Sequence, residues 1–323
     1  MEVPDDLVLA DLYPRRALIR DQRARLARAP ERPADPSIHR ELSHGWLLPY
    51  LWSAESFTWG RWAYWLQAAQ TGHLPPGPIL RIDWRTSPAD GGAWAASRRM
   101  LERSLDAIAP GWGSWSTWRH FDYLLDWVLF GCGHPGTPEL PPEPSAGASD
   151  RLYQVFDASA LILCPSDYLG DVLAESQYGH RQGFYPTPHT VTECLALVNF
   201  SADQDHRLER VLDPCVGTGR LLLHASNFSL RLFGADIDAT LVKACLVNGY
   251  LYAPWLVRPL AWLDDAADVL GAAAAVDEAI AAAAPQAPFA TAEPDPEAWR
   301  FVPIRKRRTG PGSSDDPLQG VLF

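Results

Sequence analysis

Two short stretches hold residues whose types and spacing could bind a small molecule. The run Asp213 to Gly219 (DPCVGTG) follows the apolar pair Val211 and Leu212 and precedes a segment with helical apolar spacing. Two glycines one residue apart let the backbone take dihedrals that a side chain forbids. The first N–H groups of a helix have no internal partner and can meet a ligand. We therefore predict a strand, a glycine loop and a helix.

An acidic residue follows the next apolar stretch. Leu232 to Ala235 reads as a second strand that ends at Asp236. In a doubly wound sheet, a carboxylate at this place binds ribose hydroxyls. The loop lacks the third glycine of dinucleotide enzymes and the Gly-Lys-Ser/Thr of a P-loop. The two stretches together predict a pocket for a nucleoside.

A third stretch, Gly183 to Pro188 (GFYPTP), lies just upstream of the glycine loop. We predict that Thr187 caps a helix beginning around His189, and a helix start of this kind can hold a carboxylate. Taken alone, the stretch also fits a simple helix start bounded by proline. Its position before the loop favours a part in the same pocket.

In this order the three stretches resemble the S-adenosylmethionine (SAM) site of amino-methylating DNA methyltransferases, and most of all the adenine-N6 group that includes type I modification subunits. GFYPTP is similar to the G-Q-x-Y-T-P signature of that group. The resemblance covers roughly Leu152 to Trp255. It implies an α/β fold with a truncated Rossmann-like SAM-binding core, and it leaves the helical, Trp-rich N-terminal region that precedes this core unaccounted for.

The resemblance implies SAM as the cofactor and assigns eight residues to it: Tyr185, Thr187, Asp213, Cys215, Gly217, Gly219, Asp236 and Ile237. Thr187 and its neighbours would meet the methionine end, and Asp213 the α-amino group. Gly217 and Gly219 would let the cofactor pass closely. Asp236 would hold the ribose, and Ile237 would pack on the adenine. Cys215 stands where relatives often have Ala or Ser, as a small loop filler.

Composition bounds the class of protein. With 323 residues and 47% hydrophobic content, the chain can form one large or two modest domains. It has no apolar run long enough to span a bilayer and no charged-then-apolar leader, so we expect a cytoplasmic protein without a membrane partner. Five cysteines and nine histidines are scattered. We therefore expect neither structural disulfides nor a metal site.

The formal net charge of -11 is unfavourable for a protein that binds DNA, because duplex affinity comes largely from neutralised phosphates. Local patches matter more than the average, however. Basic residues cluster between Arg15 and Arg28 and again between Arg305 and Arg308. These clusters permit DNA binding without arguing for it, because each such cluster is more often a solvated face or tail than a DNA contact.

Four segments are expected along the chain. Residues 1–130 form a helical region that begins with a helix over Leu12–Ala29, and His44 to Trp127 holds eleven of the fourteen tryptophans. We interpret these tryptophans as a helical core, with a partner interface or base-stacking platform as the alternative. Residues 131–150 are a Pro/Gly-rich linker. Residues 151–265 are the methyltransferase-like domain, and 266–323 are an Ala/Pro-rich, partly disordered tail.

Within the methyltransferase-like domain we expect further elements. Helices are predicted over Arg151–Leu163 and Ser166–Tyr178, with Ser166 as an N-cap, and over Ala239–Tyr250. A third strand is predicted over Val257–Leu263. It would end at Asp264 and Asp265, one of which could meet the adenine amino group or else simply start a helix.

No catalytic residue can be assigned from the sequence. Adenine-N6 enzymes need a strand ending in Asn/Asp-Pro-Pro-Tyr/Phe, whose side chain and proline carbonyl accept the hydrogen bonds of the target amine while the aromatic ring stacks on the flipped base. No such tetrad follows Asp265. Three other stretches each lack part of it: 164–168 (CPSDY), 141–143 (PPE) and 294–297 (PDPE).

Three hypotheses remain open. The chain is a SAM-dependent adenine-N6 DNA methyltransferase or one subunit of a restriction-modification system, with the tetrad supplied by a divergent form of the motif or by a partner subunit. Alternatively, it is a catalytically inactive relative that senses SAM or binds DNA or protein as a scaffold. Thirdly, it methylates a substrate other than DNA. In addition, Gln319–Phe323 (QGVLF) is similar to the Q-L-x-L-F peptides that dock on the bacterial sliding clamp, with Gly320 departing from the usual Leu.

Overall fold

The computed structural model describes residues 44–84, 92–109, 118–175, 184–201, 204–260, 262–263 and 321–322. Several predictions fall outside these ranges. They concern the helix over Leu12–Ala29, both basic clusters, the stretch 294–297, and the Ala/Pro-rich tail apart from 321–322. Within the described ranges, no helix combines the length and the apolar character that a bilayer span requires.

The described part of the chain is mainly helical. The helices are α4 (Leu48–Thr58), α5 (Arg61–Thr71), α6 (Gly92–Ile108), α7 (Trp118–Gly131), α8 (Ala148–Val155), α9 (Ala158–Leu163), α10 (Tyr168–Glu175), α12 (His189–Asn199), α13 (Arg220–Ala225), α14 (Ala239–Tyr252) and α15 (Pro254–Val257). The strands are β1 (Arg210–Asp213), β2 (Arg231–Ala235) and β3 (Val321–Leu322).

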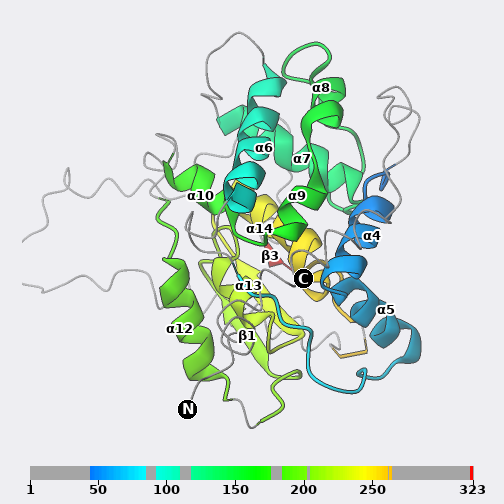
Figure 1. The fold of residues 1–323 in the computed structure, drawn as a ribbon, viewed down its shortest axis with the longest axis vertical. Helices are drawn as coiled ribbons and strands as arrows, with labels where there is room; N and C mark the ends of the chain where they lie inside the picture. Colours follow the sequence, from blue (N-terminus) through cyan, green and yellow to red (C-terminus); the bar gives the residue numbers. More distant parts are fainter. Residues whose placement is uncertain are drawn as a thin grey trace, which may run out of the picture.

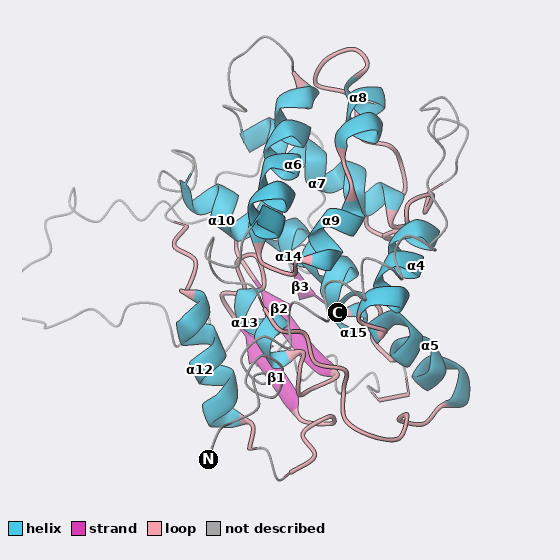
Figure 2. Ribbon diagram, in the orientation of Figure 1, coloured by secondary structure: helices cyan, strands magenta, loops and turns pink. Residues whose placement is uncertain are grey.

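The structure contains the strand, glycine loop, helix and second strand that the sequence predicts, and both strands belong to one sheet. β1 and β2 pair in parallel, with Val211 opposite Leu232 and Asp213 opposite Gly234. The chain passes between them through the glycine loop and α13 (Figure 2). β3 pairs antiparallel with the other edge of β2, giving the order β1-β2-β3. This sheet places the carboxyl ends of β1 and β2 side by side.

Helix α14 is the centre of the packing. It is apolar all round, and most of its residues are buried, which is typical of a helix surrounded by protein. It contacts α4, α7, α9, α10, α13 and α15. In Figure 1 it lies between the helical part above, with α6 to α9, and the part below, with the strands, α12 and α13. The predicted helix from Ala239 is thus confirmed, and it extends to Tyr252.

The predicted helical core of tryptophans is confirmed in part, because Trp52, Trp59 and Trp65 are only half-buried and pack against its outside. Trp46, Trp62, Trp84, Trp94 and Trp127 are all buried. One buried cluster joins residues of α4, α6 and α7 with residues of α8, α9, α10 and α14. The hydrophobic core therefore extends across the loop between α7 and α8.

Buried hydrogen bonds of Arg61 also connect the two parts of the chain. Glu55 accepts hydrogen bonds from the backbone N–H groups of Arg61 and Trp62 (2.9 and 2.8 Å). The Arg61 guanidinium, fully buried, donates to Ser226 Oγ and to the Tyr252 carbonyl (both 2.8 Å). Charged groups are this deeply buried only when they are paired and hydrogen-bonded. Arg61 thus fixes α5 against the ends of α13 and α14.

The predicted third strand is wrong. Pro254 instead begins the short helix α15, which ends at Val257, and the following residues bend and turn. Proline is well suited to the first turn of a helix because its missing N–H would have no partner there. Trp255 and Leu256 are buried in the helical form. The apolar run that indicated a strand is accounted for by burial of this helix.

Three details of the predicted helices also need correction. The helix predicted over Arg151–Leu163 is interrupted, because the Asp157 side chain accepts a hydrogen bond from Ser159 N (2.9 Å) and starts α9. Asp167, rather than Ser166, caps α10 by accepting from Gly170 N (2.9 Å). Helix α12 begins after Pro188 without a side-chain cap, so Thr187 does not cap it.

Candidate cofactor site

The glycine loop is fixed to the second strand at its centre. Val216 N donates to the carbonyl of Ala235 (2.9 Å), and Cys215 N donates to Asp213 Oδ1 (3.1 Å). Gly217 and Gly219 both have positive φ, 54° and 88°. This conformation is costly for residues with a side chain. The loop therefore turns back on itself directly beside the end of β2.

Asp236 completes this junction. Its Oδ2 accepts a hydrogen bond from Gly217 N, and its Oδ1 accepts one from Asp238 N, both at 2.9 Å. Each carboxylate oxygen has two lone pairs, so capacity for a ligand remains. The structure thus brings Asp213, Gly217 and Asp236, three of the predicted site residues, to one place.

The two glycines are required by different neighbours. A Cβ at Gly217 would lie 3.2 Å from the ring of Phe184, which belongs to the GFYPTP stretch. A Cβ at Gly219 would lie only 2.5 Å from Cys245 Sγ on α14. Close packing of α14 is therefore a sufficient reason for the second glycine. The first glycine lets the GFYPTP stretch approach the loop.

The site is electrostatically suited to a cation. Burial and the nearby charge of Asp236 raise the pKa of Asp213. Burial, Asp236 and Asp213 likewise raise the pKa of the Cys215 thiol. Among the described residues, the hydrogen-bond donors to both carboxylates are backbone N–H groups. A positively charged ligand between the two carboxylates would relieve their repulsion.

The remaining predicted residues lie at or near the surface. Tyr185 and Ile237 are 74% and 67% exposed, and Cys215 and Thr187 are also exposed. The Thr187 carbonyl accepts a hydrogen bond from Arg220 Nη1 (3.1 Å) on the first turn of α13. Arg220 thus holds the GFYPTP stretch against the helix that follows the loop.

A buried polar network supports the loop from behind, and sequence reasoning missed it. Asp167 is fully buried and accepts hydrogen bonds from Thr218 Oγ1 (2.6 Å), Arg220 Nε (3.0 Å) and Asn248 Nδ2 (2.9 Å). Asn248 also donates to the Thr218 carbonyl (2.9 Å). One acid therefore joins α10, the glycine loop, α13 and α14. In the sequence, Asp167 appears as an ordinary acid in the first turn of the helix predicted over Ser166–Tyr178.

Charges in this network shift several pKa values. Burial opposes ionisation of Asp167, but Arg220 and the hydrogen bond from Thr218 outweigh it and hold its pKa below the usual range. Burial and repulsion from Asp167 raise the pKa of Asp171 to about 6. Burial and Arg220 lower the pKa of His189 to about 4. The network therefore contains one firmly ionised acid and a histidine kept neutral.

Two of the three stretches weighed as substitutes for the catalytic tetrad have structural roles. Asp167, in the 164–168 stretch, is fully buried and shared among the partners above. Glu143, in the 141–143 stretch, accepts hydrogen bonds from the N–H groups of Gly147 and Ser149 (2.8 and 2.9 Å) at the start of α8. Both carboxylates therefore have local structural partners.

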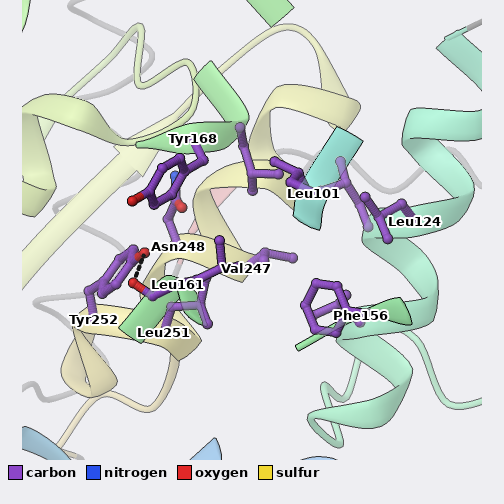
Figure 3. Close-up of a pocket in the computed structure, with 12 residues that line it drawn as sticks. Leu101, Leu124, Phe156, Leu161, Tyr168, Val247, Asn248, Leu251 and Tyr252 are labelled. Carbon is purple, nitrogen blue, oxygen red and sulfur yellow. Dashed lines mark hydrogen bonds between the residues drawn. The ribbon is translucent and has the colours of Figure 1, made fainter. Parts of the chain in front are cut away.

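The interior behind the network is closed. A cavity of about 10 Å³ lies among apolar side chains such as Leu101, Leu124 and Phe156, with Tyr168, Asn248 and Tyr252 on one side (Figure 3). Tyr252 donates to the carbonyl of Leu161 (3.1 Å). This volume is near the minimum for a single water molecule. This cavity is therefore too small for a ligand of the size of a nucleoside.

Comparison with known proteins agrees with this geometry. Residues 167–253 match the family model described as N-6 DNA Methylase. This stretch belongs to that family. No curated protein and no solved structure matches the chain. The methylase region begins at Asp167 and includes the glycine loop, Asp236 and all of α14, so the resemblance inferred from the three stretches is confirmed for this part of the chain.

Proposed function

We propose that the methylase region binds SAM and that the chain acts as an adenine-N6 DNA methyltransferase or as one subunit of such an enzyme. The observation that carries this proposal is the hydrogen bond from Gly217 N to Asp236 Oδ2 (2.9 Å), which joins the glycine loop to the acid after β2. It forms one site from two motifs that lie apart in the sequence. The family match supplies the link to DNA methylation.

The residues present fit SAM. Asp213 and Asp236 offer carboxylate oxygens for an ammonium group and for ribose hydroxyls. The exposed apolar side chain of Ile237 follows Asp236 and is free to cover an adenine ring. Bound SAM would supply an activated methyl group on a positively charged sulfur. The two acids would hold the cofactor through its charge and its sugar, while the loop lets it approach the backbone.

A second candidate function is a catalytically inactive relative that retains the SAM site. Its support is that no Asn/Asp-Pro-Pro-Tyr/Phe tetrad follows Asp265, and that Asp167 and Glu143 are structural. Incorporation of labelled methyl groups into DNA, with and without added partner proteins, distinguishes the two functions. Methylation of a protein or small molecule instead would favour the third hypothesis.

The cofactor site is tested by calorimetric titration with SAM and with its demethylated product. We expect saturable binding at micromolar levels or tighter, about -8 kcal/mol. Asp236→Ala should abolish it, because it removes both the ribose acceptor and the acceptor for Gly217 N. Cys194→Ser, at an exposed position of α12 outside the eight assigned residues, should bind normally. Intact binding by the Asp236 variant would refute the assignment.

A further inference from the structure

The outer edge of β2 is covered by the last residues of the chain. β3 runs antiparallel to β2, with Leu322 opposite Gly234 and Val321 opposite Ala235. It also contacts α14. An uncovered strand edge presents unpaired N–H and C=O groups. The C-terminus thus satisfies part of the edge of the strand that carries Asp236.

The place where β3 pairs is close to the candidate cofactor site. Ala235, opposite Val321, is bonded through its carbonyl to Val216 N of the glycine loop. The next residue is Asp236, whose carboxylate accepts from Gly217 N. The end of β2 therefore lies between the loop on one side and the C-terminal strand on the other.

The end of β2 contains a glycine, whose backbone is intrinsically flexible. Gly234 has no side chain, and a Cβ there would lie 2.8 Å from Val216 Cγ2, so the close approach of the loop requires glycine. Glycine in a strand gains order only from its neighbours, because its backbone is the most flexible of all residues. Gly234 has a neighbour on each side, Asp213 of β1 and Leu322 of β3.

We propose that β3 is a positioning element of the cofactor site: its pairing holds the end of β2 so that Asp236 meets the glycine loop. This inference rests on the proposed SAM site. Pairing of β3 orders the end of β2, and binding of the cofactor orders Asp236 at the same place. Each event therefore lowers the conformational entropy that the other must overcome. The C-terminus therefore raises cofactor affinity without touching the cofactor.

The test compares the full chain with a variant that lacks residues 319–323. Affinity for SAM and for its demethylated product is measured by calorimetry, and amide hydrogen exchange is followed at Gly234 and Ala235. The deletion should weaken SAM binding by about fivefold or more. It should also speed exchange at these two amides, with and without SAM. A peptide of residues 317–323 added in trans should restore both.

Point variants separate the pairing from other effects of the deletion. Val321→Pro combined with Leu322→Pro removes the N–H groups that a ladder needs and should behave like the deletion. Val321→Ile keeps a β-branched residue and should bind SAM like the unchanged chain. Equal thermal unfolding of all variants would show that the changes in affinity are local. If the deletion variant is less stable, restoration of SAM binding by the added peptide shows that the variant is still folded and that pairing was what it lacked.

The outcomes are distinct. Binding by the full chain together with equal binding by the deletion variant would overturn the role of β3 and leave the SAM site intact. Failure of the full chain to bind SAM would overturn the SAM site and this inference together. Weakened binding that the peptide restores would establish the role.

Discussion

At the scale of single residues, Asp167 decides how the candidate site is held. It has no contact with the outer side of the loop, yet it bonds Thr218, Arg220 and Asn248. Arg220 in turn bonds Asp171 (2.7 Å) and the carbonyl of Thr187. The loop and the GFYPTP stretch therefore share one buried anchor. A substitution of Asp167 should loosen both segments.

We expect Asp167→Asn to destabilise the protein by about 3 kcal/mol, because it removes the fully buried carboxylate of an ion pair and leaves Arg220 with Asp171 as its acidic partner. Denaturant unfolding measures this. The matched control is Glu175→Gln, which breaks the ion pair of Arg98 with a 65% exposed carboxylate and should cost at most about 1 kcal/mol. Equal effects of the two variants would contradict the anchor role.

The buried histidines predict how stability depends on pH. Burial and the neighbouring His189 lower the pKa of His224 to about 4, well below the value of about 6.5 in an unfolded chain. Between these values the unfolded state binds the proton and the folded state does not, so stability falls as pH drops from about 6.5 to about 4. Above about pH 6.5 His224 makes no pH-dependent contribution.

Unfolding curves at several pH values test this at His224. The variant His224→Gln should lose less stability than the unchanged chain between pH 6.5 and 4, because it has no such proton to bind. Each unit of pKa difference corresponds to about 1.4 kcal/mol, so the two curves should diverge clearly. His73→Gln, at an exposed position after α5, should follow the unchanged chain. Parallel curves for all three proteins would contradict the prediction.

At the scale of elements, the contact between the glycine loop and α14 sets the shape of the site. Cys245 of α14 occupies the space that a side chain at Gly219 would need. Asn248, one turn later, bonds both Asp167 and the Thr218 carbonyl. Helix α14 therefore fixes the loop from behind through packing and through hydrogen bonds. The strand β3 pairs with β2. While residues 321–322 are paired there, they are not available to dock on a sliding clamp.

Gly219→Ala should destabilise the protein by roughly 2–4 kcal/mol, because it adds overpacking against Cys245 Sγ to the strain of a positive φ. Gly72→Ala is the matched control. Gly72 also has positive φ, but a Cβ there would have no atom within 4 Å, so only the backbone strain applies. Combining Gly219→Ala with Cys245→Ala should recover part of the loss. Similar losses at Gly219 and Gly72 would show that the contact with Cys245 is unimportant.

At the scale of the whole molecule, the Trp-rich part and the methylase region share a core. The main buried cluster includes Trp46 and Trp127 of the former and Leu251 and Tyr252 of the latter. Arg61 adds a buried polar connection. The domain boundaries at residues 130 and 150 remain a prediction. Because the core extends across them, we expect both parts to unfold in one cooperative transition.

Arg61→Met should therefore destabilise both parts of the protein at once. It removes the buried donor to Ser226 Oγ and to the Tyr252 carbonyl and should cost about 2–5 kcal/mol. Calorimetry should show one unfolding transition, shifted to lower temperature. Two separate transitions, with only one of them shifted, would show that the parts fold independently.

The sequence by itself determined the local elements of the site. Two glycines and an acid after a short apolar run specify a strand, a tight loop and a helix, because only glycine accepts the positive φ values that the loop uses. The acid that ends the next apolar run marks the second strand. These signals lie within a few residues of each other, so pattern and spacing suffice to predict them, and the family match at 167–253 agrees with them.

Only the tertiary structure decided what surrounds these elements. Val257 and Leu260 have the apolar character of a strand, yet they are buried at and beyond the end of a short helix, because packing and not propensity settled the conformation there. Asp167 reads as an ordinary helix start until Arg220 and Asn248, far along the chain, are placed beside it. The pairing of residues 321–322 with β2 likewise depends on long-range contact, which a local pattern cannot specify.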